Sequence, residues 1–351
     1  MTLAETTAPR AADPPAPRTP PLTLRAGGLL IAVGVLVLIA LLSIAVGAKA
    51  IPLGTVVHEL FHYDGSDNGV IIRSLRLPRT VLGLAIGASL GLAGALMQGL
   101  TRNPLADPGV LGINSGAAAA IVTAIAVFGL RTPGSYVWFA LVGAGIAAAL
   151  VYLLGSRGRS AATPVRLALA GAAVTAVLQS FVIGLTLLDT TAFNDYRFWS
   201  VGSLATEPMS ILTATGPFLL IGVLLAVYLA RPLNALALGD DTGRALGAHL
   251  GRTRALGMLA IALLCGAATA TVGPIAFVGL TVPHVARAIT GPDQRWVLPY
   301  SAVLAPILLL GSDIVGRIIA RPGEIQVGIV TAFIGAPVFI MIARRRRMAQ
   351  L

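Results

Sequence analysis

The sequence is dominated by apolar segments of about 20 residues, separated by short loops that hold most of its arginines. A helix of about 20 apolar residues spans the hydrocarbon core of a bilayer. The sequence contains ten such segments, of which the eighth is short and interrupted by Gly279 and Pro283. The ten segments are residues 27–47, 78–100, 109–129, 136–155, 167–188, 209–230, 255–273, 275–290, 296–318 and 325–343. The sequence therefore predicts an all-α, polytopic membrane protein with about ten transmembrane helices.

Composition agrees with a membrane protein, because only 11% of the 351 residues are charged, against roughly 25% in soluble domains. The formal net charge of +11 lies between apolar segments, which favours membrane lipid over nucleic acid as its counterpart. Cys265 is the single cysteine, so an internal disulfide is excluded. Residues 1–26 are rich in proline and are interpreted as a disordered cytoplasmic tail, and residues 27–347 as the ten-helix transmembrane domain.

The distribution of positive charge predicts the orientation in the membrane. Cytoplasmic loops carry an excess of lysine and arginine. If both termini are cytoplasmic, 17 of the 25 lysine and arginine residues fall on the cytoplasmic side. The eight on the outer side are Lys49, Arg73, Arg76, Arg79, Arg131, Arg197, Arg317 and Arg321. We therefore expect a multi-pass protein of the cell inner (cytoplasmic) membrane with both termini inside.

Three of the outer arginines, Arg73, Arg76 and Arg79, form a cluster that runs against this charge rule. Two interpretations remain open: side chains that reach toward lipid headgroups from a helix end, or a docking patch for an acidic partner. Directly after the cluster, Gly83, Gly87 and Gly91 recur every four residues. Small residues on one helix face allow close backbone approach in lipid, so the second segment is predicted to be a crowded central helix.

The stretch His58-Glu59-x-x-His62 matches the pattern of zinc proteases, in which two histidines bind the metal and the glutamate is the general base. A catalytic zinc site needs a third protein ligand. The other two histidines, His249 and His284, are assigned to the opposite membrane face, and Asp64 or Asp67 carries no recognisable motif. A membrane zinc metalloprotease is therefore only a remote alternative, and no metal site is predicted.

The energy source constrains the function further. Ion-driven carriers need ionisable groups at membrane depth, and Asp313 is the main candidate inside the predicted spans. The only lysine, Lys49, is not part of a phosphate-binding loop of the Gly-x-x-x-x-Gly-Lys type. An ATP-driven mechanism would therefore require a separate subunit that binds ATP and Mg, and an ion-coupled carrier is the alternative. We expect no cofactor on this chain.

Residues 231–254 form a cytoplasmic loop that is too long for a simple connection between two spans. Asp240 and Asp241 can start a short helix. Leu246 and Leu250 would share its apolar face, and Gly247 and Gly251 would end it. The loop is either a receptor for a cytoplasmic subunit or a solvated connection.

Three blocks, residues 75–117, 273–287 and 323–345, carry a resemblance to a known family. They include "LRLPRTVLGLAIGASLGLAGALMQGLTRNPLADPG", "GPIAFVGLTVPHVAR" and "GEIQVGIVTAFIGAPVFIMIARR". From about residue 27 onward the chain resembles the permease subunits of binding-protein-dependent ABC importers, type II, for ferric siderophores, haem and vitamin B12. The third block departs slightly, because "EIQVG" stands where the family usually has Glu-Leu-Pro-x-Gly.

The resemblance implies a permease that is not itself an enzyme and that imports an iron chelate by alternating access. A ferric siderophore is favoured, with haem and vitamin B12 as alternatives. It also implies a second permease subunit as homo- or heterodimer, two cytoplasmic ATPase subunits and an extracytoplasmic substrate-binding protein. The binding-protein docking residues that it implies are Arg76, Arg79 and Arg317. The ATPase-coupling residues are Leu238, Gly239, Asp240, Arg244, Ala245, Leu246 and Gly247, and the translocation path holds Thr175, Gln179, Thr331 and Phe333.

Overall fold

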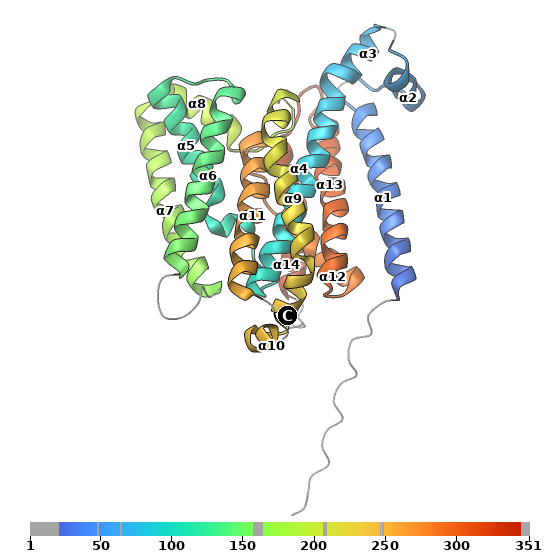
Figure 1. The fold of residues 1–351 in the computed structure, drawn as a ribbon. Helices are drawn as coiled ribbons and strands as arrows, with labels where there is room; N and C mark the ends of the chain where they lie inside the picture. Colours follow the sequence, from blue (N-terminus) through green and yellow to red (C-terminus); the bar gives the residue numbers. More distant parts are fainter. Residues whose placement is uncertain are drawn as a thin grey trace, which may run out of the picture.

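The computed structural model describes residues 21–344 except residues 48, 64, 157–163, 206–208, 246 and 248. The described part is a bundle of helices and contains no strand, which confirms the all-α prediction (Figure 1). The longer helices are α1 (Leu22–Ala45), α4 (Leu77–Thr101), α5 (Ile113–Phe128), α6 (Pro133–Ser156), α7 (Pro164–Leu188), α9 (Met209–Ala237), α11 (Leu250–Val272), α12 (Val278–Thr290), α13 (Gln294–Ile319) and α14 (Val327–Arg344). The shorter helices are α2 (Leu53–Phe61), α3 (Asp67–Ile71), α8 (Thr190–Trp199) and α10 (Asp240–Ala245), with a π-helical turn at Ile72–Arg76 and a 3₁₀ turn at Pro108–Leu111.

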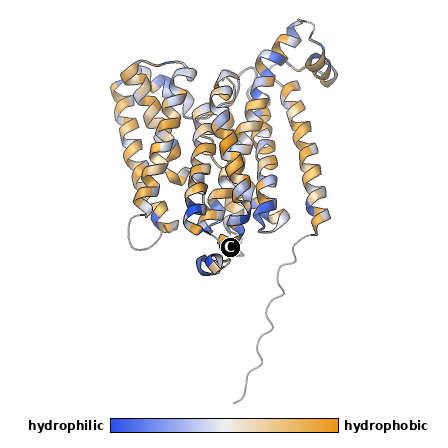
Figure 2. Cartoon of the chain, viewed as in Figure 1, coloured by the Kyte–Doolittle hydropathy of each residue, from blue (hydrophilic) through white to orange (hydrophobic). Residues whose placement is uncertain are grey.

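Each of the ten predicted segments coincides with one of the ten longer helices. Within the described residues, seven of these helices are long and apolar enough to cross a membrane, and α5, α12 and α14 are shorter. Figure 2 shows apolar residues along the long helices and hydrophilic residues gathered at their ends and in α10. This distribution is typical of a multi-pass membrane protein.

The starts of α1, α5 and α11 differ most from the sequence prediction, and α11 is described with the loop that precedes it. α1 begins at Leu22 rather than near residue 27, and its first turn is held where the Tyr300 hydroxyl donates a hydrogen bond of 2.7 Å to the Arg25 carbonyl. α5 begins at Ile113 because residues 103–111 form a compact turn. In that turn the Asn103 side chain accepts a hydrogen bond from the Leu105 N–H, and the Asp107 side chain accepts one from the Gly109 N–H.

The crowded central helix that the glycine stripe predicted is α4, which packs closely against α13. A methyl group on Gly87 would lie 2.6 Å from the Pro306 backbone, and one on Gly91 would lie 2.4 Å from the Ser301 carbonyl oxygen. Further along α4, a methyl group on Gly94 would lie 1.8 Å from the carbonyl oxygen of Gly279 in α12. Glycine is required at these positions because backbone, rather than a movable side chain, occupies the space.

The eighth predicted segment is a continuous helix, α12, and is not broken at Gly279 or Pro283. A proline inside a helix leaves the carbonyl four residues earlier without its intrahelical donor. Here that carbonyl belongs to Gly279, and the Gln98 side-chain amide of α4 donates to it at 3.4 Å and to the Leu280 carbonyl at 3.0 Å. A neighbouring helix therefore supplies the donor that Pro283 lacks.

Candidate docking, coupling and pathway sites

The predicted docking arginines lie at the end of the bundle that carries α2 and α3, opposite α10 (Figure 1). Arg76 ends the π-helical turn before α4, and its side chain is turned inward and buried. Its Nη1 donates to the carbonyls of Ile44 and Ala45, both at 2.7 Å, and its Nη2 donates to the Lys49 carbonyl. A helix C-terminus leaves carbonyls without partners and attracts positive charge. Arg76 therefore caps α1 and anchors the segment that follows it.

Arg79 and Arg317 converge on one carboxylate, that of Asp313. Arg79 Nη2 lies 2.6 Å from Asp313 Oδ1, and Arg317 Nη2 lies 2.8 Å from Asp313 Oδ2. Arg317 also donates to the carbonyls of Ser43 and Val46 at 2.8 and 2.7 Å. Because Asp313 is fully buried and paired with two arginines, its carboxylate is held as a structural counter-ion in this arrangement.

A hollow of about 300 Å³ opens beside this cluster. Lys49 and the three predicted docking arginines line it, and Glu324 is the carboxylate at its wall, 2.7 Å from Arg79 Nη1. The structure thus brings Arg76, Arg79 and Arg317 together around one positively charged hollow. The sequence reasoning missed the pairing with Asp313 and Glu324. The four-residue spacing from Asp313 to Arg317 on one helix was a usable signal, whereas nothing local pointed to Glu324.

The zinc-protease pattern folds into α2 and its C-terminal cap. The rings of His58 and His62 stack 5.4 Å apart. Glu59 is buried away from solvent, and its Oε1 accepts a hydrogen bond of 3.0 Å from the Ser66 hydroxyl. Among the described residues, no group of three His, Cys, Asp or Glu side chains is placed to hold a metal ion. The glutamate of the pattern is therefore part of the packing between α2 and α3.

The predicted coupling loop is organised by Asp240, the first residue of α10. Its carboxylate lies 3.1 Å from Arg102 Nη2, just after α4, and 2.9 Å from Arg254 Nη2 on α11. Burial alone would raise the pKa of Asp240, but the hydrogen bond from Arg254 and the charges of Arg254, Arg102 and Arg244 outweigh it and hold that pKa below its ordinary value. Three separate elements are thus fastened at one carboxylate. The sequence reasoning missed Arg102 because it lies 138 positions from Asp240. It missed Arg254, 14 positions away, because that pair joins two different helices and does not follow a helical spacing.

The other coupling residues surround this point. Gly239 and Gly247 bracket α10 with φ angles of +100° and +81°, as glycine at a turn or helix end allows. Leu238 is exposed, and Arg244 lies 3.5 Å from Asp241 in an exposed pair. Ala245 ends α10, and Leu246 lies outside the described residues.

The predicted loop boundaries are corrected in two places. Residues 231–237 continue α9 through Pro232, so the loop proper begins at Leu238. Leu250 does not belong to the short helix: it starts α11 and is buried, and Gly251 lies inside α11 rather than ending a helix. The sequence pattern misassigned both residues because α11 begins five residues earlier than expected.

The predicted path residues lie on α7 and α14. Thr175 is half-buried on α7, and the exposed Gln179 donates a hydrogen bond of 3.4 Å to the Ser115 hydroxyl of α5. Phe333 on α14 is 78% exposed. Thr331 is fully buried, and its hydroxyl donates to the Gly328 carbonyl at 3.0 Å, so it faces neighbouring helices rather than an open surface.

Comparison with known proteins identifies the class of this chain. Residues 35–345 match the FecCD transport family. The chain belongs to the FecCD family. Its members are permease subunits of ABC importers, so the FecCD chain is a transport protein and not an enzyme, and ATP hydrolysis belongs to a separate subunit.

Individual relatives of this FecCD chain are similar over nearly their full length. The ferric enterobactin transport system permease protein FepD of Escherichia coli (strain K12) is 47% identical, over 89% of this chain and 93% of that protein. The probable siderophore transport system permease protein YfiZ of Bacillus subtilis (strain 168) is 42% identical, over 81% and 85% of the two chains. The hemin transport system permease protein HmuU of Yersinia pestis is 36% identical, over 89% and 93%.

A solved structure shares the fold of this FecCD chain. It is an inward-facing conformation of a metal-chelate type ABC transporter, with a TM-score of 0.81 and 28% sequence identity. The alignment covers 91% of this chain and 99% of the other. Membership of this family excludes the zinc-protease alternative for His58-Glu59-x-x-His62.

Proposed function

We propose that this chain is the permease subunit of an ATP-driven importer that moves a ferric siderophore across the inner (cytoplasmic) membrane by alternating access. The observation that carries the proposal is the 47% identity to a ferric enterobactin permease along 311 residues. Similarity to the hemin permease is weaker, at 36%, which favours a siderophore over haem. Vitamin B12 is the remaining alternative that the sequence blocks imply.

We further propose that all ten longer helices span the membrane and that both termini are cytoplasmic. The excess of positive residues on one side supports this orientation. In Figure 1, α1 begins at the end of the bundle where α10 lies, as this topology requires. The importer would contain a second permease subunit, identical or related, together with two cytoplasmic ATPase subunits carrying ATP and Mg, and an extracytoplasmic substrate-binding protein.

The hollow lined by Arg76, Arg79 and Arg317 is the proposed docking point for the substrate-binding protein. Four cations and one carboxylate line it, so it attracts an acidic side chain. Arg79, the least buried of the three arginines, is shared between Asp313 and Glu324. A carboxylate of the partner would take the place of Glu324, whose own side chain is 37% exposed.

The proposed contact with the ATPase subunits is α10 with its flanking glycines. The helix lies at the end of the bundle, and its exposed Asp241 and the exposed Leu238 just before it are available to another protein. Asp240 ties α10 to α4 and α11, the two most buried spans. A displacement of α10 would therefore be transmitted to the centre of the bundle.

The proposed translocation path uses the faces of α7 and α14 that this chain leaves uncovered. Thr175, Gln179 and Phe333 lie on these faces, and Thr331 supports α14 from behind. The surface is apolar with scattered hydroxyl and amide groups, and the part of it that the structure describes holds no group of three His, Cys, Asp or Glu side chains for a bare metal ion. Such a lining suits passage of a whole chelate.

Uptake of radioactive iron chelates into cells that lack this chain tests the proposal. Restoring the chain should restore uptake of a ferric siderophore, and not of haemin or cobalamin. Uptake should persist when the proton gradient is dissipated and stop when the nucleotide-binding lysine of the ATPase subunit is replaced. Uptake that continues with an inactive ATPase subunit, and stops only when the proton gradient is dissipated, would favour an ion-coupled carrier and contradict the proposal.

A further inference from the structure

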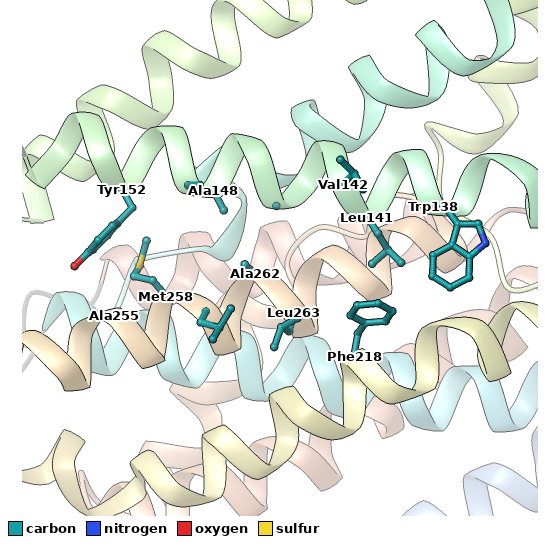
Figure 3. Close-up of a pocket in the computed structure, with 13 residues that line it drawn as sticks. Trp138, Leu141, Val142, Ala148, Tyr152, Phe218, Ala255, Met258, Ala262 and Leu263 are labelled. Carbon is teal, nitrogen blue, oxygen red and sulfur yellow. The ribbon is translucent and has the colours of Figure 1, made fainter. Parts of the chain in front are cut away.

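An apolar groove runs along the bundle between α6, α9 and α11 (Figure 3). Its volume is about 370 Å³, and its wall is made of aliphatic and aromatic side chains, with small residues such as Gly145 and Ala148 along α6. Trp138 and Val142 on its edge are 49% and 60% exposed, so the groove is open to the surroundings of the bundle. It is therefore a furrow in the membrane-facing surface rather than an internal cavity.

The two ends of the groove carry side chains that prefer the membrane interface. Trp138 packs edge-on against Phe218 at one end, with ring centroids 6.3 Å apart, and Tyr152 lies at the other end (Figure 3). Tryptophan and tyrosine are enriched where hydrocarbon meets headgroups. Trp138 and Tyr152 are separated by roughly 21 Å of helix, which exceeds the roughly 15 Å depth of one leaflet. The groove is thus long enough to hold an extended acyl chain.

Beyond Tyr152 the groove continues into a basic recess. A second pocket of about 20 Å³ shares Tyr152 and Met258 with the groove and is lined further on by Arg102 and Arg254, so an anionic group can reach these arginines at its mouth and not inside it. These two arginines face a single carboxylate, that of Asp240. The three charges leave a net charge of +1 in the recess, which one anionic group would neutralise.

We propose that the groove and the recess together bind one anionic phospholipid. One acyl chain lies between α6 and α11, and the phosphate lies at the mouth of the recess beside Arg102 and Arg254, where the Arg102 side chain is 33% exposed. Basic pockets between transmembrane helices on the cytoplasmic side are suited to anionic headgroups, and a zwitterionic headgroup would leave the net charge uncompensated. The proposal rests on the topology given above, which places the recess in the cytoplasmic leaflet.

The position of the recess allows this lipid to affect α10. Arg102 and Arg254 are the residues that fasten α10 through Asp240. A phosphate bound to the two arginines competes with Asp240 for them, so it weakens the attachment of α10. The lipid composition of the cytoplasmic leaflet therefore regulates how firmly α10 is held.

Native mass spectrometry of the detergent-purified chain, titrated with palmitoyl-oleoyl phosphatidylglycerol or phosphatidylcholine, tests the proposal. One phosphatidylglycerol should be retained per chain with about fivefold preference, because one arginine near a lipid phosphate contributes about that factor. Arg254→Gln should remove most of the preference, whereas Asp240→Asn should increase it by freeing both arginines. Arg295→Gln is the matched control at an exposed arginine that is paired with Asp293, and it should leave the preference for phosphatidylglycerol unchanged.

A second variant tests the groove separately from the recess. A Cβ atom on Gly145 would meet nothing within 4 Å, so Gly145→Leu places an added side chain at the groove, and Gly34→Leu on α1, where a Cβ also meets nothing, is its control. Gly145→Leu should abolish retention of both lipids, and glycerol phosphate without acyl chains should not compete. The proposal would be overturned if the unmodified chain retained the two lipids equally, or if Gly145→Leu retained them unchanged. It would also be overturned if Gly145→Leu converted a dimer into monomers, because the groove would then be a contact between two copies of the chain. These readouts need no transport, so they fail independently of the proposed import function.

Discussion

Nη2 of Arg79 lies 2.6 Å from Oδ1 of Asp313, a carboxylate that the fold has removed entirely from solvent. Arg317 holds the other oxygen of the same carboxylate. Removing one member of a buried ion pair leaves the remaining charge uncompensated and costs roughly 3–5 kcal/mol. We therefore expect Asp313→Asn to destabilise the purified protein by about 3 kcal/mol, measured as a lower midpoint of thermal unfolding in detergent.

Glu324→Gln provides the matched control for Asp313→Asn. Glu324 also pairs with Arg79, but its side chain is 37% exposed. An exposed pair contributes about 0–1 kcal/mol, so this variant should unfold near the temperature of the unmodified protein. Equal destabilisation by the two variants would show that burial of Asp313 is not what makes its pairing important.

Docking of the substrate-binding protein should respond to Glu324 and Arg79 in opposite directions. Glu324→Gln removes the carboxylate that competes for Arg79, so docking should strengthen by about fivefold. Arg79→Gln should weaken it by a similar factor, and higher salt should weaken docking in both backgrounds. The measurement is the affinity and association rate of the binding protein on the reconstituted permease, at two salt concentrations. Weaker docking in Glu324→Gln would exclude the hollow as the docking point.

Gly94→Ala should be among the most damaging single substitutions in the chain. The added methyl would lie 1.8 Å from the Gly279 carbonyl oxygen, and both partners are helix backbone that cannot move independently. Overpacking typically costs about 1–3 kcal/mol, and a contact this short should reach the upper end of that range. Gly34→Ala on α1 meets nothing within 4 Å and should be neutral or slightly stabilising. Size-exclusion profiles and thermal unfolding of the two variants provide the comparison.

Asp240 and Asp241 are adjacent, yet the structure gives them different roles. Asp240 bridges Arg102 and Arg254, whereas the Asp241 side chain is fully exposed. Asp240→Asn should reduce binding-protein stimulation of ATP hydrolysis severalfold in the reconstituted complex, because α10 loses its attachment to α4 and α11. Asp241→Asn leaves that attachment intact and removes one exposed charge at most, so it should reduce stimulation far less than Asp240→Asn. Equal loss in both variants would assign the effect to the surface of α10 and not to its attachment.

The sequence predicted the helical class and the place of each long helix because apolar length is a local property. The glycine stripe from Gly83 to Gly91 also predicted the central position of α4, since it repeats along one helix face. The continuity of α12 was not predictable from its own residues. It depends on the amide of Gln98, which lies almost 200 positions away and satisfies the carbonyl that Pro283 leaves without a donor.

The candidate sites show the same division between local and distant information. The arginine cluster was visible in sequence, but not the burial of Arg76, because the carbonyls that it caps belong to the end of α1. The short helix at Asp240 was visible, but not its anchoring by Arg102 and Arg254. The sequence shows which residues carry charge, whereas the partners of those residues depend on which helices the fold brings together.

The stability of the protein should depend on pH through Asp293, the N-cap of α13. Hydrogen bonds from the Arg295 side chain lower the pKa of Asp293 most strongly, burial opposes this, and the Asn234 amide adds to the lowering, so that the pKa falls to about 2. A carboxyl with a depressed pKa stabilises the folded state above its unfolded pKa, and the contribution is lost as pH falls toward the folded pKa. After discounting for solvent around Arg295, the stabilisation at pH 7 is roughly 1 kcal/mol.

Asp293→Asn keeps a capping side chain but removes the charge. Its thermal midpoint should therefore lie below that of the unmodified protein at pH 7, and only about a quarter of the difference should remain at pH 3. A difference that stays constant from pH 7 to pH 3 would show that the amide disturbs the cap itself and that the charge of Asp293 contributes nothing.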